Sequence, residues 1–148
     1  MRGVGLVCLA SGVIRPPEPD LAARLAHIHA GVDALIIEWK PDTIGLESVF
    51  SARSARSALV LGQARGAALA ACARTGLPIC EYAPTQVKTA VAGHGQAGKA
   101  QVQRMVQMLL DLQRPPAQDA ADALAIAICH VRRRETLALL ERASRSPS

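Results

Sequence analysis

Residues 77–103 read "LPICEYAPTQVKTAVAGHGQAGKAQVQ" and change character several times along their length. The first of them, 77–82, are mostly apolar and predict a short buried strand. Pro84 then opens a short helix that runs to about Ala92, and a glycine-rich loop over 93–98 leads into a further helix. This strand and its helices continue an alternation of strands and helices along the chain, which predicts an α/β fold with a parallel element.

The glycine-rich loop raises the question of a nucleotide site. Gly93, Gly98 and Lys99 have the spacing G-x-x-x-x-G-K of a phosphate-binding P-loop. A P-loop also needs a strand before it and a hydroxyl residue after the lysine, whereas here a helix precedes the loop and Ala100 follows Lys99. We therefore expect no nucleotide cofactor. The loop still suits another phosphate, because N–H groups at a helix start attract anions.

Strand and helix patterns continue on both sides of this stretch. Residues 4–14 predict a buried strand, and residues 43–47 predict a second one that ends at Glu47. Asp20 is placed to cap the helix that follows "RPPEPD". Helices are expected over residues 21–39, 54–75, 98–112 and 118–142.

The bulk properties favour one soluble domain. The chain has 148 residues, of which 50% are hydrophobic and only 2% aromatic, so we expect an aliphatic core. We predict a single domain over 1–142 and a flexible tail over 143–148. A net charge of +5 is compatible with a polyanionic partner but does not require one. Cysteines without zinc-site spacing, no membrane-length apolar run and no signal peptide predict a cytoplasmic protein.

Acidic residues at two element ends are the first candidates for chemistry. Glu47 ends a strand, and Asp119 and Asp122 lie one helical turn apart at the start of a helix. Each has a simpler interpretation: Glu47 can point to water, and helix starts favour aspartate. If the carboxylates converge, their oxygens suit magnesium or manganese. Paired ions of this kind catalyse phosphodiester hydrolysis.

Basic residues accompany these acids. The stretch after Glu47 carries Phe50, Arg53, Arg56 and Arg65. The arginines can hold phosphates and Phe50 can stack on a base, although a solvated helix start with a core phenylalanine has the same pattern. For Arg65 we favour the solvated interpretation. Lys88 and Lys99 flank the glycine-rich loop, and the histidines show no metal-ligand spacing.

Several long blocks then converge on one family. They resemble the RuvC family of Holliday-junction resolvases, in order and with matching spacing, from about Ala10 to His130. The blocks are "PDTIGLESVF", "SALVLGQARGAAL", "PICEYAPTQVKTAVAGHGQAGKAQVQRMV" and "QDAADALAIAICH".

The resemblance implies an RNase H-like α/β fold, a mixed sheet flanked by helices. It also implies a homodimer that nicks four-way DNA junctions with magnesium, two ions per subunit, for which manganese can substitute. Glu47, Asp119 and Asp122 match the family's acidic metal-binding positions. Lys88 and Lys99 match basic catalytic positions near the scissile phosphate, and Phe50 matches an aromatic position implicated at the junction. Arg53 and Arg56 join the predicted DNA-binding residues only because they are cations close after Glu47. The helix over 54–75 matches the element that pairs across the dimer. The family works with the branch-migration motor complex of RuvA and RuvB.

The start of the chain departs from the family pattern. The family opens with a strand that ends in "GIDPG", whose aspartate is an essential metal ligand, and a second strand follows. The chain matches only from the third strand, so the first two strands are missing. We expect a longer native product with an earlier start. The alternative function is a truncated, catalytically impaired form that binds junctions without cutting them.

Overall fold

The computed structural model describes residues 5–48 and 53–145. These residues fall into two compact units, which are described separately below: residues 13–81 form one, and residues 5–12 with 82–145 form the other. The single domain expected over 1–142 stays a prediction.

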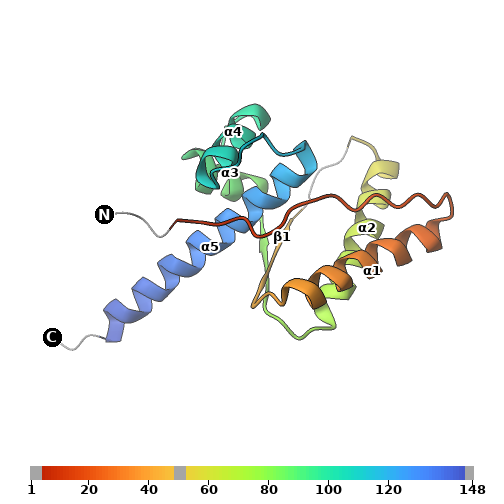
Figure 1. Cartoon of the computed structure of the whole chain (residues 1–148), viewed down its shortest axis with the longest axis horizontal. Coiled ribbons are helices and arrows are strands. Elements are labelled where there is room, and N and C mark those ends of the chain that lie inside the picture. Colours follow the sequence, from red (N-terminus) through yellow and green to blue (C-terminus); the bar gives the residue numbers. More distant parts are fainter. Residues whose placement is uncertain (1–4, 49–52, 146–148) are drawn as a thin grey trace. The chain divides into compact units, whose positions relative to one another are not determined.

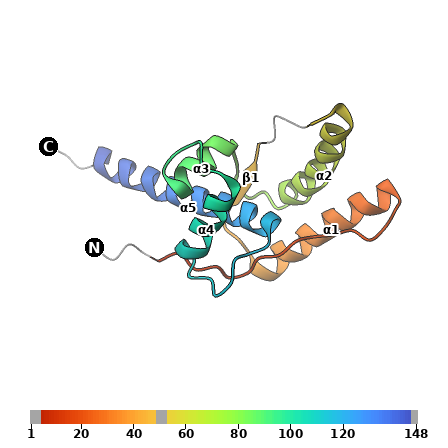
Figure 2. The same ribbon diagram turned by 90° about the horizontal axis from the view of Figure 1, so that it is seen from above.

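The unit over 13–81 contains the helix α1 (Leu21–Trp39), the strand β1 (Ile44–Glu47), the helix α2 (Ala55–Ala73) and most of the strand β2 (Ile79–Tyr82). The helices α1 and α2 lie side by side (Figures 1 and 2). Both begin at a capping side chain, which the sequence analysis expected for Asp20. Asp20 accepts a hydrogen bond from the Ala23 N–H at 3.0 Å, and Ser54 accepts one from the Ser57 N–H at 3.1 Å.

The sheet in the described residues consists of β1 and β2, which run parallel. The Ile44 N–H donates to the Pro78 carbonyl at 2.9 Å, next to the start of β2. The helix α2 makes the crossover between the strands, as expected for a parallel pair. These strands and their crossover helix confirm the sequence prediction.

The strand predicted over 4–14 is not formed in its described part, residues 5–14, which lie in no helix or strand. Val7 and Leu9 are 77% and 73% exposed. An apolar run becomes a strand only where a neighbouring strand takes up its backbone N–H and C=O groups. The described sheet, β1 and β2, does not include this run, so its apolar pattern alone was misleading.

The second unit packs three helices around an aliphatic core. They are α3 (Pro84–Ala92), α4 (Lys99–Leu109) and α5 (Gln118–Arg145), and the first half of α5 packs against both others (Figure 1). Along α5 the buried residues recur at helical spacing, which makes one apolar face. That face consists of Ala120, Ala121, Leu124, Ala125, Ile128 and Cys129.

The second half of α5 leaves this core, and residues 131–145 are exposed except for Arg132. The helix ends at Arg145, beyond the predicted end near Arg142.

All four cysteines are free, and burial raises the pKa of the Cys72 and Cys129 thiols. Among the helices of residues 5–48 and 53–145, none has the length and apolar character needed to cross a membrane.

Candidate active site

The acidic pair Asp119 and Asp122 lies at the start of α5. Both side chains are exposed, while the intervening Ala120 and Ala121 are buried against the other helices of the unit. The core therefore fixes the rotation of the helix start, and the residues one turn apart present both carboxylates on the open side. The helix is therefore buried on one face from its first turn, while the face of the two carboxylates is open.

Lys99 and Asp119 act electrostatically on Asp122. The protein around Asp122 removes part of its hydration and raises the pKa of its carboxyl, although the residue remains exposed. The positive charge of Lys99 lowers this pKa, and the negative charge of Asp119 raises it. The structure thus brings together three of the predicted site residues from two separate helices.

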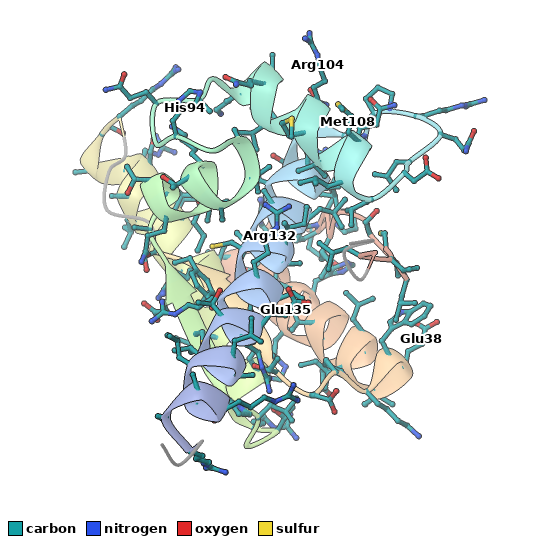
Figure 3. The ribbon with its side chains drawn as sticks, turned by 90° about the vertical axis from the view of Figure 1, so that its left-hand side faces the viewer. Glu38, His94, Arg104, Met108, Arg132 and Glu135 are labelled. Atoms are coloured by element: carbon teal, nitrogen blue, oxygen red, sulfur yellow. The ribbon has the colours of Figure 1, made fainter. Side chains whose placement is uncertain are left out.

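The loop before Lys99 explains its position. Gly93 ends α3 with φ of 87°, a conformation that favours glycine, and Gly98 is the N-cap of α4. Lys99 is the first residue of α4, and it is exposed. His94, labelled in Figure 3, lies in the loop. Its Nε2 atom is 3.4 Å from Nε2 of Gln101. Because this loop joins two helices, it lacks the strand-to-helix geometry of a P-loop, as the sequence predicted.

The other predicted basic residues lie on α3 and at or just before the start of α2. Lys88 lies half-buried on α3, in the same unit as Lys99. Arg53 and Arg56 are exposed, before and within the first turn of α2. Phe50 lies outside the described residues. The roles of these residues in DNA binding therefore stay predictions.

Glu47 belongs to the other unit, where it is the last residue of β1. Its carbonyl oxygen accepts a hydrogen bond from Nε of Arg65 at 3.3 Å. The Arg65 guanidinium also pairs with Oε1 of Glu81 at 2.8 Å, and the Ser48 hydroxyl lies 3.4 Å from the other carboxylate oxygen. Arg65 is thus bound to the ends of both strands. The prediction of a merely solvated Arg65 was wrong, because sequence spacing did not show which strand ends it reaches.

The described acidic residues do not form a complete metal site. In the stretches 5–48 and 53–145, no three His, Cys, Asp or Glu side chains are grouped so that they could hold an ion. Asp119 and Asp122 supply only carboxylate oxygens, which fit a hard divalent cation, but two ligands do not complete a site. The proposed third ligand, Glu47, lies in the other unit.

A buried pair that the sequence analysis missed joins Tyr82 to α5 within one unit. The Tyr82 hydroxyl lies 2.6 Å from Nδ1 of His130, and the residues are 1% and 5% exposed. Their rings meet edge to face, and the Arg133 guanidinium lies 5.7 Å from the Tyr82 ring centroid. Burial of the imidazole is the main cause that lowers the pKa of His130, and the positive charges of Arg134 and Arg133 lower this pKa further. The one available signal was a lone tyrosine in an otherwise aromatic-poor chain.

Two more contacts bind α3 to α5. Arg132 donates from its guanidinium to the Ala90 carbonyl, in the last turn of α3, and Figure 3 shows its place on α5. The Cys129 thiol lies 3.8 Å from the Gln86 carbonyl. The Ala90 carbonyl belongs to the group that a helix end leaves unpaired, so Arg132 acts as a cap. These contacts fix the end of α3, from which the loop to Lys99 starts.

Comparison with known proteins identifies a family. The model of the family "Crossover junction endodeoxyribonuclease RuvC" matches residues 1–130. A protein of that name from Anaeromyxobacter sp. (strain K) is 54% identical over 133 residues, which cover 90% of this chain and 71% of the relative. Its counterpart from Burkholderia multivorans is 51% identical over 140 residues, covering 95% and 78% of the two chains.

Solved structures agree with this assignment. RuvC from T. thermophilus in complex with a Holliday junction substrate has a TM-score of 0.81 and 36% identity, covering 88% of this chain and 81% of that one. Another Thermus thermophilus RuvC structure has a TM-score of 0.70 and 38% identity, covering 79% and 71%. The expected RNase H-like fold is confirmed. The chain therefore belongs to the RuvC family of crossover junction endodeoxyribonucleases, which are metal-dependent nucleases.

Proposed function

We propose that this protein resolves Holliday junctions, making paired nicks in four-way DNA during recombination and repair. The observation that carries the proposal is the group of Asp119, Asp122 and Lys99, in which two carboxylates and a cation influence each other at an open helix start. The similarity to a RuvC solved with its junction substrate supports the same function. The basic charge of the chain favours a polyanionic substrate.

The proposed roles follow from the chemistry of each side chain. Glu47, Asp119 and Asp122 hold magnesium, two ions per subunit, and manganese can substitute. When bound, the ions supply Lewis acidity for phosphodiester hydrolysis. Lys99 and Lys88 stabilise the negative charge on the scissile phosphate. The residues that contact the remaining DNA are Phe50, Arg53 and Arg56.

The proposed assembly is a homodimer that works with the RuvA and RuvB motor. The helix α2 supports the dimer, because Leu59, Val60 and Leu61 are 62%, 54% and 47% exposed on it. Adjacent apolar side chains exposed in this way are typical of an interaction surface. Two subunits related by a two-fold axis present the same site to both strands, so paired symmetric nicks follow.

The test is a cleavage assay with the 148-residue chain. We expect nicks at symmetric positions in a synthetic four-way junction when magnesium is present. A linear duplex of the same sequence should stay intact, and EDTA should stop the reaction. The alternative function, binding without cutting, requires a stable junction complex in a gel-shift assay and no nicks at saturating magnesium. Failure both to bind and to cut the junction contradicts both functions.

Lys99 supplies a prediction of its own. Lys99→Met should lower the cleavage rate about a hundredfold, the usual cost of removing a preorganised group that stabilises developing charge. The same change removes the cation that lowers the pKa of Asp122, so that pKa should rise further in the metal-free protein. Single-turnover rates and a carbon-13 NMR titration of the carboxyl measure the two effects. Lys99→Arg, which keeps the charge, is the control and should leave the Asp122 titration close to wild type.

A further inference from the structure

Arg65 joins the ends of both strands from the helix α2. Its Nε atom donates to the Glu47 carbonyl at 3.3 Å, and its terminal nitrogen lies 2.8 Å from Oε1 of Glu81. The other Glu81 oxygen is 3.4 Å from the hydroxyl of Ser48, which is only 8% exposed. The main chain at Glu47 is therefore held at its own carbonyl and through the following residue.

This arrangement contributes little to stability by itself. The side chains of Arg65 and Glu81 are 29% and 49% exposed, and exposed ion pairs of this kind are weakly stabilising. Its effect is instead on orientation. The strand β1 is short and ends at Glu47, so its last residue needs an outside partner to keep a fixed direction. A guanidinium presents its N–H donors in a fixed plane and so serves two acceptors in one set geometry, whereas the three N–H donors of a lysine ammonium rotate on a flexible stem.

We infer that Arg65 and Glu81 are positioning residues that orient Glu47 for its part in junction cleavage. The inference rests on the proposed function, because it takes Glu47 as a site residue. Neither residue touches the substrate in this role: Arg65 holds the Glu47 main chain, and Glu81 holds Arg65 and Ser48. Removing a residue that holds a metal ligand in place, without touching the metal itself, typically lowers metal affinity or activity by roughly 10- to 100-fold.

A competing role for Arg65 is a direct contact with a DNA phosphate. The two roles give opposite results at Glu81. A carboxylate repels the DNA backbone, so Glu81→Gln should leave junction binding unchanged or tighten it if charge alone matters. If Glu81 positions Glu47 through Arg65, the same variant should cut more slowly despite normal binding.

The experiment compares Glu81→Gln and Arg65→Lys with wild type, each in the 148-residue chain. We expect the single-turnover cleavage rate to fall about tenfold or more and the half-saturating magnesium concentration to rise, with the junction Kd within about twofold. Glu38→Gln is a matched control, because Glu38 is exposed on α1 in the same unit, and it should cut like wild type.

Hydrogen exchange supplies a readout that does not depend on activity. In the metal-free protein, both variants should exchange the amides of residues 44–48 faster than wild type, and residues 118–130 should exchange as before. A wild-type protein that binds junctions without cutting them would refute the proposed function, and the exchange at 44–48 would still decide the roles of Arg65 and Glu81.

Two results overturn the inference while the proposed function stands. One is wild-type cleavage by Glu81→Gln and Arg65→Lys at every magnesium concentration. The other result combines two observations: Glu81→Gln cuts like wild type, and Arg65→Gln binds the junction more weakly and with a smaller salt dependence. That combination would make Arg65 a phosphate contact.

Discussion

Asp119→Asn and Asp122→Asn will each abolish junction cleavage, by roughly a thousandfold or more, while the junction remains bound. An amide replaces one anionic oxygen with a donor, so it weakens the ligation of a divalent cation without changing the size of the side chain. Both residues are exposed and lie opposite the buried face of α5, so the core is unaffected. Single-turnover cleavage and gel-shift binding at equal protein concentration measure the two effects.

Asp122→Asn should also stabilise the fold. The pKa of Asp122 is raised in the folded protein, so its protonated form favours folding and this contribution is lost as pH rises through the folded pKa. At neutral pH the ionised carboxyl therefore destabilises the metal-free fold, and the amide removes that cost. The melting temperature of the variant should exceed that of wild type at pH 7, and the difference should shrink below the ordinary aspartate pKa, near 4.

Asp111→Asn is the control for both effects. Asp111 is exposed in the same unit, with φ of 49°, a conformation that asparagine tolerates as well as aspartate does. It should cut and melt like wild type. Wild-type cleavage by Asp119→Asn or Asp122→Asn would show that the altered carboxylate is no metal ligand. Loss of junction binding would instead place the altered residue in DNA recognition.

Local chemistry made much of the fold predictable. Gly93 ends α3 and Pro84 begins it, and both signals act within one turn of the residues that they affect. Asp20 begins α1 for the same reason. The short strands around 44–47 and 79–82 were recognisable from their apolar residues, and the helix between them is long enough for a parallel crossover.

The missed features depend on partners far apart in the sequence. Tyr82 and His130 are 48 positions apart, and Ser48 and Glu81 are 33 apart, so no periodicity connects them. The apolar run over 5–14 has the composition of a strand, but composition cannot supply the neighbouring strand that it needs. The candidate site divides in the same way. One-turn spacing indicated that Asp119 and Asp122 act as a pair, whereas the place of Glu47 depends on tertiary structure.

Tyr82→Ala should cause the largest loss of stability among single substitutions in this chain, about 3–5 kcal/mol. Tyr82 is 1% exposed and is the largest of the fully buried side chains among the described residues. The change removes its ring contacts with His130 and Arg133 and the hydrogen bond to Nδ1. Since a domain is typically stable by roughly 5–15 kcal/mol, urea titration should show a large shift of the midpoint.

Tyr82→Phe separates the hydrogen bond from the ring. It keeps both ring contacts and removes only the hydroxyl, so the expected loss is smaller, about 1–3 kcal/mol. Leu139→Ala is a control for apolar truncation, because Leu139 is 64% exposed on the outer part of α5 and should change stability by less than about 0.5 kcal/mol. Equal midpoints for Tyr82→Phe and wild type would mean that the hydrogen bond contributes nothing net.

The same pair predicts a pH dependence. Because the pKa of His130 is lowered in the folded protein, its neutral form stabilises the fold, and this contribution is present above the ordinary histidine pKa. It is lost as pH falls through the folded pKa, since a buried imidazolium beside Arg133 and Arg134 is unfavourable. Wild type should therefore lose stability on acidification below about pH 6.5, beyond the loss in His130→Leu. Parallel pH profiles for the two proteins would exclude His130 as the titrating group, because leucine carries no proton and the difference between the profiles isolates the imidazole.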